Sequence, residues 1–358
     1  MLAIFFFLEK NVNFKLMDNT IMAHSSTFTV VFALIGNIGI AIAKYVGWFF
    51  TGSGAFLAEA FHSTADVINQ AFLLVGLKRA DRESDELYHY GYGKANFFWS
   101  FISALGVFVF GAALSIYHGI HSFMHPDLTA HLQIQKFLLL SFIILGVNFI
   151  VDLSSLWVAL KELNHSRQGI SLKKYIKEST NPTTIAVFLE DIAACLGVFL
   201  AMLSIGLTIF FKSPYPDAVG SILIGLMMAG LSIFLMLKNK SLLMGKAIAP
   251  EMQTKILNAL KSMESVESVN EIKSMVISAK EFKLKAHIDF KGAYFLKSIP
   301  EAEIEKYHRS IKNYEDFKKF LEMFSDLIGE KMSDEIDRIE MELQKQFPGM
   351  KNLTVEPD

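Results

Sequence analysis

Residues 51–66 read Thr-Gly-Ser-Gly-Ala-Phe-Leu-Ala-Glu-Ala-Phe-His-Ser-Thr-Ala-Asp, a short turn that leads into an apolar stretch. The turn separates two apolar segments, 27–50 and 53–77, and each is long enough to cross about 30 Å of hydrocarbon as a helix. Because only Thr51–Gly54 joins them, we expect a tight helical hairpin. The second segment also carries three ionisable side chains, which are unusual inside a membrane.

Four further apolar segments of similar length follow, at 97–121, 136–160, 182–211 and 215–237. The composition agrees with six spans, since 52% of the 358 residues are hydrophobic and 32 of them are Phe. Basic residues gather in the second and fourth loops and after the last segment, which predicts that both termini face the cytoplasm. The sequence therefore predicts an all-α bundle of six transmembrane helices over residues 25–245.

The character of the chain changes after Gly245, where charges occur throughout and no apolar run is long enough to span a bilayer. Alternating patterns predict strands at 266–278, 282–290 and 352–355, and helical patterns occur at 250–264, 300–311, 314–330 and 333–347. We expect residues 246–358 to form a small cytoplasmic α+β domain of ferredoxin-like type with a helical insertion. Residues 1–24 are interpreted as a disordered or misassigned leader.

The ionisable side chains of the second segment are Glu59, His62 and Asp66, whose spacing places them on one face of a helix. A charge near the bilayer centre costs at least about 2.5–3.5 kcal/mol, so such residues are functional candidates. An imidazole and a carboxylate one turn apart can bind one divalent ion, and these ligands suit Zn, Mn or Fe. The alternative is a polar pair that stabilises helix packing. Glu59 is interpreted as lining the entrance.

Acidic residues in two other segments extend this candidate site, namely Glu190 and Asp191 in the fifth segment and Asp152, one turn after Asn148, in the fourth. Adjacent residues point about 100° apart on a helix, so only one of Glu190 and Asp191 can face the His62–Asp66 pair squarely. The other is expected to pair with a cation such as Lys44, or to be protonated. Asp152 either lines the same cavity or bonds across helices, and both interpretations stay open.

Several classes of protein are excluded or disfavoured by what the sequence lacks. Cys195 is the single cysteine, which excludes an intrachain disulfide and any CxxC motif. No basic cluster with stacking aromatic residues indicates a nucleic-acid partner. Neither a nucleophile with a base nor an HExxH-like pair indicates an enzyme, and no cofactor is expected. A metal transporter and a metal-gated channel or sensor remain as alternatives.

The chain resembles the cation diffusion facilitator family, with a particular likeness to its zinc transporter 9 subgroup. The matching stretches are Gly36–Lys44, Thr51–Asp66, Tyr90–Lys94, Leu114–Ile120, Phe188–Ala194 and Glu335–Leu343. The resemblance covers about residues 28–356, nearly the whole chain. It implies a homodimeric zinc/proton antiporter that alternates access and exports metal from the cytoplasm.

The resemblance also implies a transport site built from one HxxxD motif in each of the second and fifth spans. These motifs correspond to His62 and Asp66 and to Asp191, whereas Val187 stands where the fifth-span histidine is expected. Glu190, Asp152 or water would then complete the ligand shell. More oxygen ligands shift the preference from zinc towards Mn or Fe, which is the alternative substrate.

The kind of membrane is predicted from the amino-terminal residues. Residues 1–24 lack the Arg-rich, acid-poor character of a mitochondrial presequence. A bacterial cytoplasmic membrane is therefore favoured, and an organellar membrane is the alternative.

Overall fold

The computed structural model describes residues 19–167, 169, 171–178, 182–278 and 281–358, which fall into two compact units that divide between Leu243 and Met244. Most of the predicted leader, residues 1–18, lies outside the described residues. Its last six residues, 19–24, belong to the first described helix.

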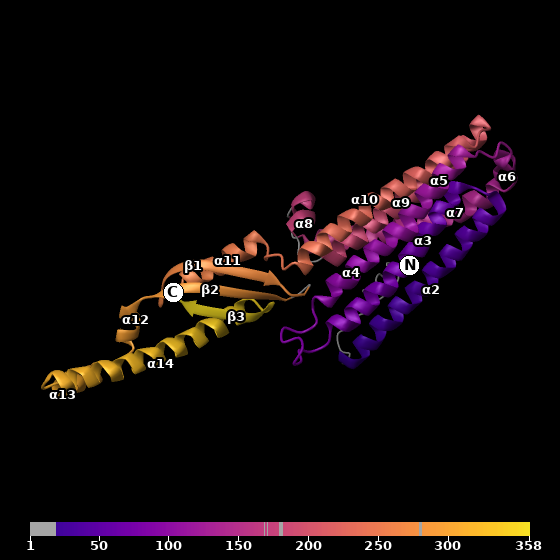
Figure 1. Cartoon of the computed structure of the whole chain (residues 1–358). Helices are drawn as coiled ribbons and strands as arrows, with labels where there is room; N and C mark the ends of the chain where they lie inside the picture. The colour runs from indigo at the N-terminus through magenta and orange to yellow at the C-terminus, as the bar shows by residue number, and fades with distance from the viewer. Residues whose placement is uncertain (1–18, 168, 170, 179–181, 279–280) are drawn as a thin grey trace. The chain divides into compact units, whose positions relative to one another are not determined.

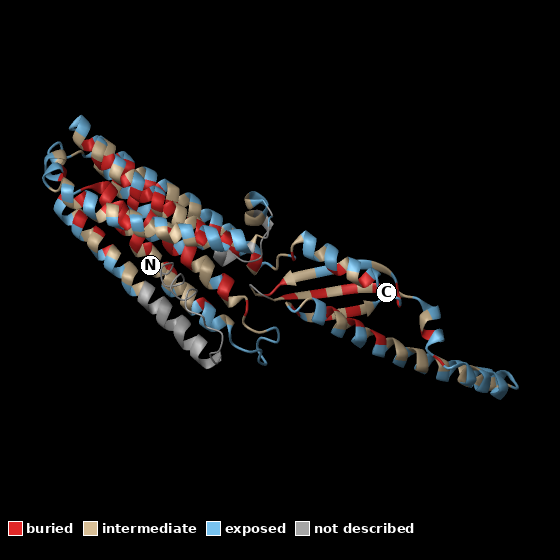
Figure 2. Ribbon diagram, turned by 180° about the vertical axis from the view of Figure 1, so that it is seen from behind, coloured by how far each residue is buried: buried red, intermediate tan, exposed pale blue. Residues whose placement is uncertain are grey.

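The amino-terminal unit is a bundle of long helices (Figure 1). They are α2 (Asn19–Thr51), α3 (Gly54–Ala80), α4 (Ala95–Gly106) continued by a π-helical segment (Val107–Ala113) and α5 (Leu114–Met124), α7 (Leu138–Ser166), α9 (Pro182–Phe211) and α10 (Tyr215–Leu243). Two short helices, α6 (Ala130–Lys136) and α8 (Leu172–Glu178), lie between the long ones. Figure 2 shows that the buried residues follow the inner faces of these helices.

Among the described residues, five helices are long and apolar enough to cross a membrane, all in the amino-terminal unit, and α3 is the long helix of that unit that is not among them. Its polarity excludes it and not its length, since its 27 residues span about 40 Å at about 1.5 Å each. Buried residues such as Phe56, Ala58 and Ala65 show that α3 lies inside the bundle. The prediction of a six-helix bundle is confirmed, with α3 as its polar member.

The turn before α3 fixes the hairpin that the sequence predicts. Gly52 has a φ of +66°, a left-handed conformation that glycine adopts without a steric penalty. Ser53 is the N-cap of α3 and accepts from the backbone N–H of Phe56 at 3.2 Å. Asp217, in the first turn of α10, accepts hydrogen bonds from Ser53 and from the backbone N–H groups of residues 54 and 55. The start of α3 is thus held by α10, a contact that the sequence pattern did not indicate.

Helices α5 and α10 pack with their backbones close together because glycines face the contact. A Cβ atom at Gly225 would lie 2.9 Å from the backbone nitrogen of Ile116 and 3.0 Å from the carbonyl oxygen of Ala112. Small residues at such contacts are typical of helix packing in membranes. The preceding π-helical segment interrupts the single α-helix that was predicted over 97–121, and helical periodicity alone carries no signal for it.

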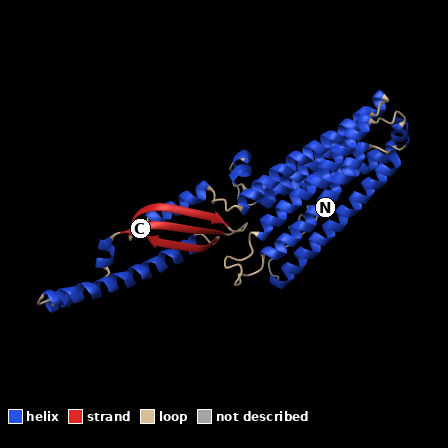
Figure 3. Ribbon diagram, viewed as in Figure 1, coloured by secondary structure: helices blue, strands red, loops and turns tan. Residues whose placement is uncertain are grey.

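The carboxy-terminal unit contains a three-stranded sheet with helices beside it (Figure 3). The strands β1 (Val266–Val276), β2 (Phe282–Phe290) and β3 (Met350–Pro357) lie in the order β1-β2-β3, with β1 antiparallel and β3 parallel to β2. The helices are α11 (Pro250–Lys261), α12 (Gly292–Lys297), α13 (Glu301–Ser310) and α14 (Tyr314–Gln346). The predicted α+β domain with a helical insertion is confirmed. Its order α-β-β-α-β follows the ferredoxin-like pattern without that pattern's first strand among the described residues.

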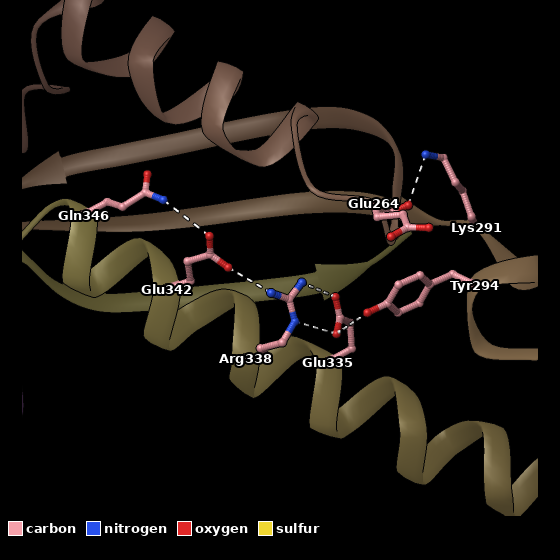
Figure 4. A network of polar contacts seen from close by, with 7 residues as sticks. All are labelled: Glu264, Lys291, Tyr294, Glu335, Arg338, Glu342 and Gln346. Carbon is pink, nitrogen blue, oxygen red and sulfur yellow. Dashed lines mark hydrogen bonds and ion pairs between the residues drawn. The ribbon is translucent and has the colours of Figure 1, made fainter. Parts of the chain in front are cut away.

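One helix of the insertion differs from the prediction, because α14 runs without a break where two helices were expected. Lys331 and Met332 are good helix formers, so nothing local ends the helix there. A polar row follows its surface, in which Arg338 donates to Glu335 at 2.6 and 2.8 Å and to Glu342 at 2.9 Å (Figure 4). Tyr294 of α12 also donates to Glu335, at 3.2 Å, which ties α12 to α14.

Candidate metal site

His62 and Asp66 lie one turn apart on α3, as the sequence predicts. The His62 Nε2 and Asp66 Oδ2 atoms are 3.7 Å apart, which is too long for a hydrogen bond. His62 is 2% exposed, and within the described part of the chain neither of its ring nitrogens has a hydrogen-bond partner. A buried polar group without a partner is costly, so a water molecule or an ion is expected to satisfy it. This imidazole is free to bind an ion.

Glu59, one turn earlier on α3, already has a cationic partner. Lys44 Nζ of α2 donates to Glu59 Oε2 at 2.7 Å, and both side chains are almost completely buried. The second oxygen, Oε1, has no hydrogen-bond partner among the described residues and would clash with a Cβ atom at Gly197 of α9. Lys44 therefore neutralises Glu59 rather than Glu190 or Asp191. A metal ion that bound Glu59 would therefore have to compete with this ion pair.

The two adjacent acids of α9 contact different helices. Glu190 accepts a hydrogen bond from Asn69 Nδ2 of α3 at 2.9 Å. Asp191 accepts from Ser155 Oγ of α7, at 3.0 Å to each carboxylate oxygen. The two carboxylates thus point to different helices, in agreement with the expectation that only one of them faces the His62–Asp66 pair. Of the two, Glu190 contacts α3, the helix that carries the pair.

Asp152 of α7 accepts a hydrogen bond from Asn148 of the same helix at 2.7 Å. This local bond does not decide between the two interpretations of Asp152, since its charge also interacts with that of Asp66. Glu190 and Asp191 lie within electrostatic range of Asp66 as well. The candidate acids of α3, α7 and α9 therefore share one electrostatic environment.

In this conformation the candidate ligands are near one another but not assembled. Across the described ranges, no group of three or more His, Cys, Asp and Glu side chains is close enough to hold a metal ion. Each acid of α7 and α9 is instead held by a neutral donor of its own. Val187, at the position where the resemblance implies a histidine, is 40% exposed.

A small pocket, partly open to its surroundings, lies beside Glu190, between α3, α4, α9 and α10. Its polar lining consists of Asn69, Ser100, Glu190 and Asn239. The Oδ1 atom of Asn239 is buried and has no partner among the described residues. Sequence reasoning missed Asn69 and Asn239, although Asn69 continues the face of α3 at a three-residue step from Asp66. It also missed Ser155, whose hydroxyl is the kind of neutral group that no charge pattern reveals.

Comparison with known proteins shows which family the chain is similar to. A family model described as the cation efflux transmembrane domain matches residues 30–244. The chain is 32% identical over 319 residues to the mitochondrial proton-coupled zinc antiporter SLC30A9 of Mus musculus, covering 87% of this chain and 55% of that protein. It is 31% identical to the same antiporter of Homo sapiens, with the same coverage.

A plant relative is similar over a larger share of its own length. The chain is 32% identical over 337 residues to metal tolerance protein C4 of Arabidopsis thaliana, covering 91% of this chain and 72% of that protein. The chain spans only about half the length of the mouse and human proteins. The family match includes every helix from α3 to α10. The chain is a membrane protein and belongs to the cation efflux family.

Proposed function

We propose that the chain is a transporter, not an enzyme, and that it exchanges zinc for protons across a membrane. The observation that carries this proposal is His62, a buried imidazole one turn from Asp66 whose two nitrogens make no hydrogen bond within the described residues. Imidazole and carboxylate together are zinc ligands. The names of the mouse and human relatives, proton-coupled zinc antiporters, support the same substrate and the same coupling.

The proposed ligands are His62 and Asp66 of α3 and Asp191 of α9, with Glu190 or Asp152 completing the shell. Their distribution over three helices means that a shift of α9 and α7 towards α3 would assemble the site. Asp191 would then exchange its hydrogen bond with Ser155 for a metal contact. With Val187 in place of a histidine, the shell has more oxygen ligands than the resemblance implies, so Mn²⁺ and Fe²⁺ are the competing substrates.

Proton coupling follows from the ligands themselves. A carboxylate or an imidazole binds metal only when it is deprotonated, so binding releases protons. When the site opens to the other side, protons compete for the same groups and release the metal. Metal would leave the compartment that contains the carboxy-terminal unit, as the distribution of basic residues predicts.

The membrane and the oligomeric state are part of the same proposal. The mitochondrial relatives favour the organellar alternative over a bacterial cytoplasmic membrane. The homodimer implied by the family resemblance is retained, and light scattering of the purified protein in detergent measures it.

Transport by purified protein in liposomes, with a zinc-sensitive dye inside and an imposed pH gradient, tests the function. We expect saturable zinc uptake by the wild type and a loss of at least about tenfold in Asp66→Ala and His62→Ala, since each change removes a charged or coordinating ligand. His165→Ala is the matched control, because His165 is an exposed histidine at the end of α7. Zinc/proton exchange by Asp66→Ala equal to that of the wild type would refute the proposal.

Two further measurements separate the alternatives. Elemental analysis of metal that co-purifies with the wild type and with His62→Ala distinguishes zinc from manganese and iron. Current recordings in planar bilayers distinguish a transporter from a channel, because a channel passes a current that an exchanger with slow turnover does not.

A further inference from the structure

A pair of histidines lies at the end of α5, far along the chain from the candidate site. His121 is in the last turn of α5 and His125 is the residue that caps it, so the two are four residues apart. Both side chains are exposed, and their ring centroids are 5.0 Å apart with an angle of 49° between the ring planes. Histidines at this spacing lie on the same face of a helix.

The separation of the rings matches the geometry of a shared metal ion. A Zn–N bond of about 2.1 Å puts the centre of an imidazole ring about 3.2 Å from the metal. Two such rings at a tetrahedral angle would have centroids about 5.2 Å apart. The observed 5.0 Å is close to this separation. We propose that His121 and His125 bind one divalent ion of the zinc class, with water at the remaining positions.

No third His, Cys, Asp or Glu side chain of the described residues forms a metal-binding group with this pair, although His118, one turn earlier on α5, is close enough to interact electrostatically with His121. His131 of α6 has its Nδ1 atom 2.9 Å from the carbonyl oxygen of Leu128. Asp127 accepts hydrogen bonds from Thr129 through its backbone N–H at 2.8 Å and its hydroxyl at 2.7 Å. Residues 114–135 contain neither Lys nor Arg, so no cationic side chain in this stretch repels an ion. Two imidazoles without a charged ligand favour Zn²⁺ over Mn²⁺ or Mg²⁺ and hold it weakly.

The pair lies at one end of the bundle. Phe123 of α5 contacts Tyr215 at the start of α10, with ring centroids 5.2 Å apart. The turn between α2 and α3 is at this end too, since a Cβ atom at Gly54 would lie 3.3 Å from the ring of His118. Loop 81–94, which joins the end of α3 to the start of α4, lies at the opposite end (Figure 1).

The role of the site rests on the proposed function, whereas metal binding by the pair does not. An ion that leaves the pathway at this end would meet two imidazoles that hold it briefly. A weak site suits this position, because tight binding at the exit of the pathway would slow the release of the metal ion. The pair thus forms a weak exit site for the transported metal, at the end of the bundle opposite loop 81–94.

Zinc titration of the metal-free full-length protein in detergent, followed by calorimetry, tests the binding. We expect the wild type to bind one more zinc ion per chain, more weakly, than the double variant His121→Ala/His125→Ala. Each single variant should weaken this ion's binding at least about tenfold, because one imidazole remains. His131→Ala is the control from the same end of the bundle and should bind like the wild type. Equal zinc stoichiometry and affinities in the wild type and the double variant would overturn the proposal.

The same titration of Asp66→Ala separates this inference from the transport proposal. If both hold, Asp66→Ala loses transport and one binding event but retains the event that depends on His121 and His125. If the transport proposal fails alone, that event persists in a protein that moves no zinc. Because both histidines are exposed, their truncation leaves the fold intact, and circular dichroism of each variant checks this.

Discussion

Replacing Lys44 by Met is expected to destabilise the transmembrane bundle strongly. The Lys44 Nζ and Glu59 Oε2 atoms are 2.7 Å apart, and the two side chains are 2% and 0% exposed. At an effective dielectric constant of about 20, two unit charges at this distance attract each other by about 6 kcal/mol. Desolvation offsets part of that attraction, but removing one partner leaves a buried, unpaired carboxylate. We therefore expect the free energy of unfolding to fall by about 3–5 kcal/mol.

Unfolding in mixed micelles with increasing denaturing detergent measures this change. The matched double variant Lys44→Met/Glu59→Leu removes both charges, and we expect it to recover most of the lost stability, since an apolar pair of similar size is often neutral. Lys136→Met is the control for the loss of an exposed lysine and should lie within about 0.5 kcal/mol of the wild type. If the double variant were as unstable as the sum of its single variants, the reasoning would be refuted, because no coupling between the two charges would remain.

Three further predictions concern packing, capping and pH. Gly197→Ala places a Cβ atom against Glu59 and should cost about 1–3 kcal/mol in the same unfolding assay, whereas Gly206→Ala on the same helix has open space and should be neutral or slightly stabilising. Asn313→Ala removes the N-cap of α14 and should cost about 0.5–2 kcal/mol, seen as faster hydrogen exchange in its first turn. Burial is the largest single influence on the pKa of Glu335 and raises it, but the hydrogen bonds to its carboxylate and the charge of the Arg338 guanidinium together outweigh burial and hold the pKa below its usual 4.5. That stabilisation is present above pH 4.5 and is lost as pH falls through the lowered pKa, so thermal unfolding followed by circular dichroism should show acid destabilisation that Glu335→Gln reduces; an unchanged acid response would contradict this.

The sequence determined the features that depend on local periodicity. Apolar length set the long helices, the glycine-rich turn at 51–54 set the first hairpin, and alternation along 282–290 set β2 with its buried and partly exposed positions. The spacing of His62 and Asp66 placed both on one face of α3. These features were predictable because a helix or a strand fixes which of its own residues share a face.

Only the tertiary structure decided which polar groups meet across helices. The pairing of Lys44 with Glu59, the cap that Asp217 supplies to α3 and the separate partners of Glu190 and Asp191 each join different helices. Such contacts depend on how each helix rotates about its axis and how closely small residues let it approach its neighbours, and neither quantity is encoded in the periodicity of a single segment. The sequence thus determined the candidate ligands, and packing decided which of them are already engaged by another side chain.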